Sequence, residues 1–123
     1  METNKNNNVA QKSLEYAVRI VNLCRVLKEK RREFVISDQI LRSGTSIGAN
    51  VREANSAQSK ADFISKMSIA QKKCDETGYW LELLYKTKTL NKLEYDSIIS
   101  DNQELFAILT AILRSAKAKP RSR

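Results

Sequence analysis

A seven-residue repeat of apolar and small side chains dominates the middle of this sequence. The members are spaced alternately four and three residues apart, and they are Phe63, Met67, Ala70, Cys74, Thr77, Leu81 and Leu84. This spacing places all of them in one stripe along an α-helix, which is the pattern of a helix-bundle seam. Such a stripe has to be buried, so the rest of the chain must supply amphipathic helices that cover it.

The remaining sequence contains three further helical patterns. The chain has 123 residues with 3 Gly, 1 Pro and 7% aromatic residues, which is the composition of a single all-α domain. The expected helices cover about 9–32, 37–55, 60–87 and 92–118. Because short connections join them, we predict an antiparallel up-down-up-down four-helix bundle. We expect a disordered tail over residues 1–8 and a basic tail over residues 119–123.

Local signals mark the starts of the helices. Ser37 can cap the second helix, while Ser59 with Asp62 and Asn91 with Glu94 have the three-residue spacing of capping boxes. Within the first helix, apolar residues at helical spacing predict one core face. That face consists of Ala10, Leu14, Ala17, Ile20, Val21, Cys24 and Leu27.

The second expected helix is rich in small and hydroxyl residues. Gly44 and Gly48 form a GxxxG pair. A glycine inside a helix costs about 1 kcal/mol relative to alanine, so we interpret the pair as a place where another backbone approaches closely. Polar residues also border or enter the core faces of the helices, and we predict that they form a hydrogen-bonding seam that sets helix register. The seam residues are Ser43, Ser46, Asn50, Glu53 and Asn102.

Two of the expected helices carry large side chains on a second side as well. These are Tyr16, Leu23 and Val26 in the first helix, and Ile69, Glu76, Trp80 and Leu83 in the third. One core cannot bury both sides of a helix, so the second side is covered either by a tightly wrapped neighbouring helix or by another subunit. We expect a subunit, and therefore a homo-oligomer with these residues at its interface.

The formal net charge is +8. A charge of this size indicates a polyanionic partner, either nucleic acid or an acidic surface, although solubility alone is an alternative explanation. The basic run from Lys28 to Arg32 also lies where cations complement a helix dipole. After Glu104 there is no acidic residue, and basic residues continue past Pro120, which favours an anionic partner. The residues predicted to bind phosphate are Lys12, Arg19, Lys28, Lys30, Arg31, Arg32, Arg114, Lys117, Lys119 and Arg121.

The sequence lacks the residues of many kinds of active site. There is no histidine, which excludes His-based general bases, triads and imidazole metal sites. Cys24 and Cys74 occupy apolar helix positions and are interpreted as reduced core residues, and no phosphate-binding or dinucleotide fingerprint occurs. We therefore expect a protein that is not an enzyme and has no metal or cofactor. A carboxylate site for Mg²⁺ or Mn²⁺, formed by Glu53, Glu76 and Glu82, is the alternative.

Nothing in the sequence indicates a membrane or an export route. No apolar run approaches the roughly 20 residues that a membrane span needs. The first residues, METNKNNNVAQK, lack the apolar core of a signal peptide. We therefore expect a cytoplasmic protein.

Two segments resemble a known family. They are LRSGTSIGANVREA and ADFISKMSIAQKKCDETGYWLELL. They resemble the bacterial four-helix-bundle family that includes the 23S rRNA intervening-sequence proteins, whose relatives include accessory proteins of diversity-generating retroelements. The similarity extends from about Ala10 to Ala116, and its most specific part is the pattern Arg-Ser-x-x-Ser-Ile-x-Ala-Asn at residues 42–50. The chain departs from the family's usual pattern at Ala54, where glycine is usual, and at Asp75, where serine is frequent.

The resemblance implies antiparallel four-helix protomers that assemble into a homopentamer. For the retroelement relatives it also implies nucleic-acid binding by a basic surface and association with a reverse transcriptase. We therefore expect a homo-oligomeric bundle that binds RNA or DNA through charge, with little sequence specificity. The alternative is a protein–protein interaction scaffold without a nucleic-acid role, in which Ile69, Trp80 and Leu83 bind a different protein.

Overall fold

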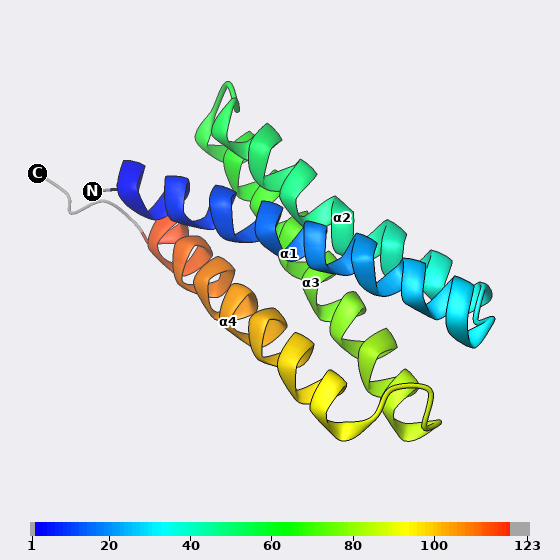
Figure 1. Ribbon diagram of the computed structural model, residues 1–123. Helices are drawn as coiled ribbons and strands as arrows, with labels where there is room; N and C mark the ends of the chain where they lie inside the picture. The colour runs from blue at the N-terminus through cyan, green and yellow to red at the C-terminus, as the bar shows by residue number, and fades with distance from the viewer. Residues whose placement is uncertain (1, 119–123) are drawn as a thin grey trace, which may run out of the picture.

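The computed structural model describes the backbone of residues 2–118 and the side chains of residues 8–118. This part of the chain forms a four-helix bundle and contains no strand (Figure 1). The helices are α1 (Glu2–Arg31), α2 (Val35–Asn55), α3 (Lys60–Lys86) and α4 (Lys92–Lys117). None of these described helices is both long enough and apolar enough to cross a membrane. The predicted basic tail, residues 119–123, lies outside the described residues.

Each helix packs against the next one in the sequence, and α1 also contacts α4. Three ion pairs join α1 to α4, and residues later in α1 contact residues earlier in α4. These pairs are Lys12–Glu104, Arg19–Asp101 and Arg31–Glu94. In Figure 1 the start of α1 accordingly lies near the end of α4, and the turn after α1 lies at the far end of the bundle.

Gly44 and Gly48 lie where α1 and α2 are in contact. A β-carbon added to Gly44 would come within 2.9 Å of the Ile20 side chain, and one added to Gly48 would come within 3.3 Å of the Ser13 hydroxyl oxygen. This close approach explains why α2 retains two glycines despite their low helix propensity. The GxxxG pair is therefore a packing motif in this protein.

The starts of α3 and α4 are capped as the sequence predicts. The Ser59 hydroxyl oxygen accepts the backbone N–H of Asp62 at 3.0 Å. Asn91 and Glu94 form a reciprocal capping box, in which each side chain accepts the backbone N–H of the other residue. Both caps involve residues only three positions apart, so the local sequence is sufficient to predict them.

The predicted cap of α2 is wrong. The helix begins at Val35, and its free N–H groups are satisfied by Glu33, whose carboxylate accepts the backbone N–H of Ile36 and of Ser37. Ser37 is buried instead, and its hydroxyl donates to the Cys24 carbonyl of α1. The glutamate side chain reaches two amides at once, which leaves the serine hydroxyl for a contact between helices.

The first helix begins earlier than the sequence predicts. Residues 2–8, which we expect to be a disordered tail, belong to α1. Their asparagine-rich sequence has a low intrinsic helix propensity. Extending an existing helix is nevertheless easier than starting one, because each added residue gains a hydrogen bond without a new nucleus. The other three helices match their expected bounds within two residues.

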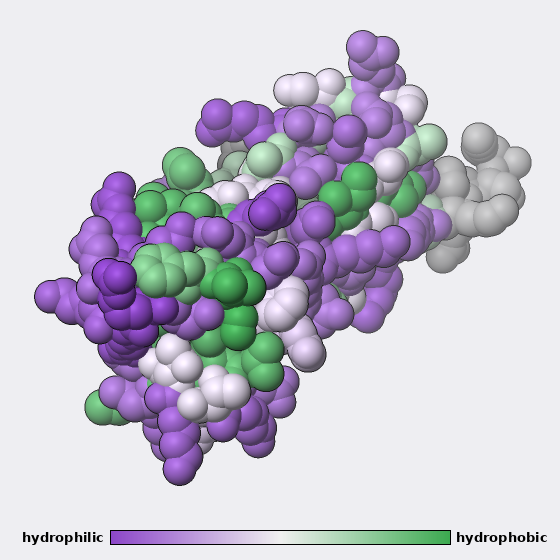
Figure 2. Space-filling model, turned by 90° about the vertical axis from the view of Figure 1, so that its right-hand side faces the viewer, coloured by the Kyte–Doolittle hydropathy of each residue, from purple (hydrophilic) through white to green (hydrophobic). Residues whose placement is uncertain are grey.

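The core lies between the four helices. The largest fully buried side chains are Val9, Ile20, Leu27, Ile40, Ile47, Val51, Met67, Leu81, Leu84, Leu90, Leu105 and Leu109. The core face of α1 differs from the predicted one, because Leu14 is 56% exposed whereas Ser13 and Tyr16 are buried. Since α1 has apolar residues on both sides, helical spacing alone does not determine which side faces the core. Figure 2 shows that hydrophobic atoms also remain in patches on the surface, between hydrophilic ones.

Candidate nucleic-acid interface

Four of the basic residues that we predict to bind phosphate are engaged with carboxylates of the same chain. The nitrogen–oxygen distances of these ion pairs lie between 2.5 and 3.1 Å. Three pairs connect α1 to α4 and one connects α1 to α2, and they are Lys12–Glu104, Arg19–Asp101, Arg31–Glu94 and Lys28–Asp38. A carboxylate beside a cation cancels much of its attraction for a phosphate. In this structure the four residues connect helices and are poorly placed to bind an external anion.

Arg31 makes the most extensive of these contacts. Its guanidinium donates to both carboxylate oxygens of Glu94 and to the backbone carbonyl of Thr89. Glu94 also accepts the backbone N–H of Asn91, so the same network contains the capping box of α4. The guanidinium, together with that N–H, lowers the pKa of Glu94, and Glu94 raises the pKa of Arg31. This network fixes the end of α1 to the start of α4.

Lys30 and Arg32, at the same end of α1, have different surroundings. Both are exposed, and neither has a carboxylate within ion-pair distance among the described residues. The guanidinium carbon of Arg32 lies 5.2 Å from the centre of the Phe34 ring, which is a cation–π contact. The turn between α1 and α2 therefore carries positive charge next to an aromatic ring.

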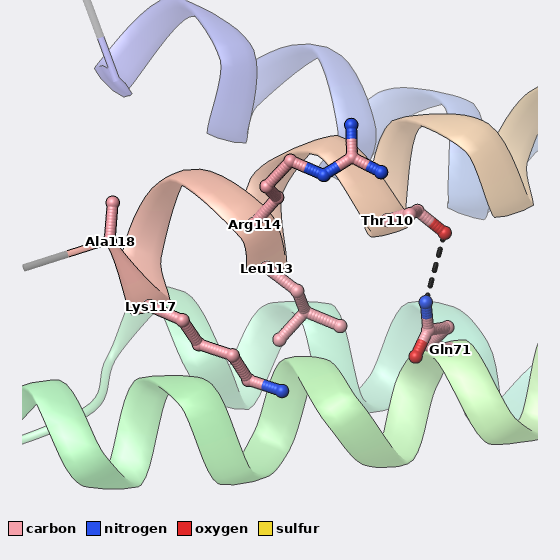
Figure 3. A pocket seen from close by; sticks show the side chains of 6 residues that line it. All are labelled: Gln71, Thr110, Leu113, Arg114, Lys117 and Ala118. Atoms are coloured by element: carbon pink, nitrogen blue, oxygen red, sulfur yellow. Dashed lines mark hydrogen bonds between the residues drawn. The ribbon is translucent and has the colours of Figure 1, made fainter.

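The last turn of α4 also carries cations without carboxylate partners. Arg114 and Lys117 are exposed, and within residues 8–118 no acidic side chain pairs with either of them. Both line a pocket of about 530 Å³ between the last turns of α4 and the first half of α3 (Figure 3). The other lining residues are Gln71, Thr110, Leu113 and Ala118. In Figure 3 the side chain of Lys117 extends towards α3, whereas that of Arg114 points away from it.

The pocket has one polar wall and one apolar wall. The side-chain amide of Gln71 donates to the Thr110 hydroxyl at 2.9 Å, and this hydroxyl donates to the Phe106 carbonyl at 2.8 Å. Leu113, which is buried, forms the apolar part. Because no carboxylate among residues 8–118 compensates the two cations at the rim, the pocket is suited to an anionic group. Lys119 and Arg121, which we also predict to bind phosphate, lie outside the described residues.

Tyr16 belongs to the core, so its prediction as an oligomer-interface residue is wrong. It is 2% exposed, and its hydroxyl accepts a hydrogen bond of 2.7 Å from the side-chain amide of Asn102. Asn102 also donates to the Cys74 carbonyl at 3.1 Å, so it joins α1, α3 and α4. Burial raises the pKa of Tyr16, which keeps the hydroxyl protonated. A tyrosine can be buried here because another helix offers a hydrogen-bonding partner for its hydroxyl.

The other predicted interface residues are partly exposed. Val26 is 36% and Ile69 37% exposed, and Leu23, Trp80 and Leu83 are half-buried. The ring nitrogen of Trp80 donates to the half-buried carboxylate of Glu76 at 3.1 Å. Other apolar or aromatic residues, which the predicted set does not include, are more exposed than these. They are Leu14 (56%), Val18 (54%), Phe34 (45%), Val35 (73%), Tyr79 (59%) and Leu93 (82%).

The predicted polar seam separates into three kinds of contact. Ser43 and Asn102 are buried and bond to other helices, Ser43 through a hydroxyl of α3 at 2.8 Å. Ser46 and Asn50 bond instead to carbonyls one turn earlier in α2. Glu53 is exposed and pairs with a lysine of α3 at 3.1 Å. Ser43 and Asn102 are therefore the seam residues whose hydrogen bonds depend on how the helices are aligned.

The remaining candidates for chemistry are dispersed. Cys24 and Cys74 are free and buried, and burial raises the pKa of Cys74 to about 12, so its thiol stays protonated. The three carboxylates that we consider for a metal site do not meet, because Glu53 and Glu76 pair with different lysines and Glu82 is exposed. In the described part of the chain, no group of three or more potential metal ligands lies close enough to hold an ion.

Comparison with known proteins gives a family and a structural relative. The family model described as 23S rRNA-intervening sequence protein matches residues 5–111, which include parts of all four helices. A solved structure from Bacteroides thetaiotaomicron, of a protein with unknown function from the S23 ribosomal protein family, is 55% identical to this chain. It superimposes with a TM-score of 0.88, and the match covers 89% of this chain and 98% of that one. No curated protein matches the chain.

Proposed function

The chain belongs to the 23S rRNA-intervening sequence protein family, and on this basis we propose that it is a non-enzymatic, homo-oligomeric four-helix bundle that binds RNA or DNA. The binding surface is the end of the bundle formed by the last turn of α4. The observation that carries this proposal is the position of Arg114 and Lys117, which border a pocket of about 530 Å³ and have no carboxylate partner among the described residues.

The distribution of charge supports this location. Glu104 is the last acidic residue of the chain, and five basic residues follow it. They are Arg114, Lys117, Lys119, Arg121 and Arg123. Cations in the last turn of a helix also complement its dipole, but this explanation does not extend to basic residues beyond the helix. Phosphate contacts carry no sequence information, so the proposed binding has little sequence specificity.

The assembly is part of the same proposal. We infer an antiparallel up-down-up-down protomer from the order of the contacts between α1 and α4, and a homopentamer from the family resemblance. The exposed apolar residues of α1, including Leu14 and Val18, supply area for contacts between subunits. Assembly would join several weakly basic ends into one strong site by raising their effective concentration. A reverse transcriptase as a further partner follows from the resemblance to retroelement accessory proteins, and co-purification would test it.

Light scattering of the purified protein, with and without a mixed-sequence RNA, tests the proposal. We expect one species of pentamer size that takes up RNA at about 50 mM salt and releases it at about 200 mM, because phosphate binding weakens steeply with salt. A monomer or dimer that binds no RNA at either salt concentration would contradict the proposal.

A second candidate function is favoured by one observation. Ile69 and Tyr79 are exposed on α3. The Tyr79 and Trp80 rings pack edge to face, with 5.1 Å between the ring centroids. Exposed aromatic residues beside a tryptophan are frequent at protein interfaces. A scaffold of this kind would bind a different protein through Ile69, Trp80 and Leu83 and would need no nucleic acid. The substitution Y79A would then abolish capture of that protein without altering the oligomer.

A further inference from the structure

The helix α1 ends in a turn whose left-handed residue is an arginine. The backbone N–H of Glu33 donates to the Leu27 carbonyl at 2.9 Å, and Arg32 has a φ of 57°. Glycine is the usual residue at this position of a helix end, because a side chain is sterically unfavourable in the left-handed region. An arginine at this strained position suggests a use for its side chain.

The surroundings of Arg32 show what this use can be. Its guanidinium lies over the ring of Phe34, which is 45% exposed, and Val35 beside it is 73% exposed. The adjacent acid, Glu33, forms no ion pair with the arginine, and its carboxylate instead accepts two backbone N–H groups at the start of α2. Lys30 adds a second exposed cation. Figure 2 views the side of the molecule on which this turn lies and shows hydrophobic atoms exposed between hydrophilic ones.

The helix dipole explains only part of this arrangement. Lys30 lies in the last turn of α1, where a cation is favourable near the free carbonyl groups. Arg32 lies beyond that turn, and a favourable charge there requires neither a strained backbone nor an exposed phenylalanine. The combination of charge and aromatic surface therefore needs a different explanation.

We propose that the turn between α1 and α2 is a second nucleic-acid site, which takes an unpaired base. The base stacks on Phe34 or on the guanidinium plane of Arg32, and the adjoining phosphates contact Lys30 and Arg32. Aromatic rings and arginine planes bind unstacked bases of any sequence in this way, whereas the bases of a duplex are stacked on one another and offer no free face. The site is specific for single strands.

This site is separate from the α4 surface but rests on the proposed nucleic-acid function. Arg31 binds Glu94 in the first turn of α4, whereas Arg114 and Lys117 lie in its last turn, so the two sites are at opposite ends of the bundle. At a rise of 1.5 Å per residue they are roughly 35 Å apart. Substitutions in the turn therefore leave the surface at Arg114 and Lys117 unchanged.

Fluorescence anisotropy of the full-length protein with a labelled single-stranded RNA and with a duplex of the same length tests this inference. The substitutions F34A and F34L both remove the aromatic face, and we expect each to weaken binding of the single strand about fivefold or more. F34W is the matched control that keeps an aromatic face, and it should bind like the wild type. None of the three should change the affinity for the duplex.

The substitution R32G separates binding from folding. Glycine tolerates the left-handed backbone, so the melting temperature should stay the same or rise, while the affinity for the single strand falls about threefold or more at low salt. The inference is overturned if F34A and R32G bind the single strand as tightly as the wild type, or if F34A weakens single-strand and duplex binding equally. A wild-type protein that binds no RNA would overturn the proposed function and this inference together.

Discussion

Three cations of α1 and the two in the last turn of α4 look alike in the sequence and differ in the folded protein. Along α1, Lys12, Arg19 and Arg31 each contact a carboxylate of α4. In the last turn of α4, Arg114 and Lys117 contact no carboxylate among the described residues and border a pocket. One set holds two helices together, and the other is available to an anion. The pairing of charges across helices, rather than the number of cations, determines where a phosphate can bind.

The largest effect on stability is expected for R31A. This substitution removes the guanidinium from a network that includes both carboxylate oxygens of Glu94 and the Thr89 carbonyl. We expect the free energy of unfolding, measured in urea, to fall by about 2 kcal/mol. R114A is the matched control, and because Arg114 is exposed and has no ion pair within residues 8–118, its effect should stay within about 0.5 kcal/mol. Equal effects of the two substitutions would show that the comparison is wrong.

The same network predicts how stability depends on pH. Arg31 and the N–H of Asn91 lower the pKa of Glu94 below its ordinary value of 4.5. As the pH falls, the unfolded chain therefore takes up the proton first, and the stability that Glu94 contributes at neutral pH is lost as the pH falls through the pKa of the folded state. The variant E94Q should be less stable than the wild type by about 1 kcal/mol at neutral pH. This difference should shrink below pH 4.5, and a difference that does not change with pH would count against the network.

An effect of similar size is expected for Y16F, which changes an uncharged contact of Asn102 in the polar seam. It removes the hydroxyl that accepts the Asn102 amide, while the Cys74 carbonyl still accepts from that amide. The free energy of unfolding should fall by about 1 kcal/mol, and RNA affinity should not change. A loss of RNA affinity at unchanged stability would mean that this part of α1 binds nucleic acid directly.

The smallest effect is expected when an α1 cation is released. D101N keeps the shape of the aspartate and removes the partner of Arg19, so RNA affinity at low salt should rise about twofold. D75N is the control, since it raises the net charge equally but Asp75 has no ion pair among the described residues. An equal gain in both variants would assign the effect to net charge alone.

The parts of the fold that the sequence predicts well depend on neighbouring residues. The repeat in α3 and the caps at Ser59 and Asn91 involve residues three or four positions apart, and the structure has them as predicted. Leu14 shows where prediction from local sequence fails. The helix α1 has apolar residues on two sides, and only the helices that pack against it determine which side is buried. Helical spacing identifies a helix but not its neighbours.

The candidate site depends on contacts that local sequence does not contain. Arg19 and Asp101 are 82 positions apart, and Tyr16 and Asn102 are 86 positions apart. Neither pair can be found without the arrangement of the helices, so the sequence predicts ten phosphate ligands without distinguishing paired from unpaired ones. The absence of acidic residues after Glu104 was the one signal in the sequence that favoured the end of α4.

The most direct test of the central claim is the salt dependence of RNA affinity in two double variants that remove equal charge. R114Q/K117Q removes the unpaired cations, and K12Q/R19Q removes cations that are paired with Glu104 and Asp101. Log affinity falls as log salt rises, and each lost phosphate contact makes this slope shallower by about 0.7 to 0.9. We predict that R114Q/K117Q makes the slope shallower by about 1.4 to 1.8 and that K12Q/R19Q leaves it unchanged. An equal or larger reduction in K12Q/R19Q would contradict the account.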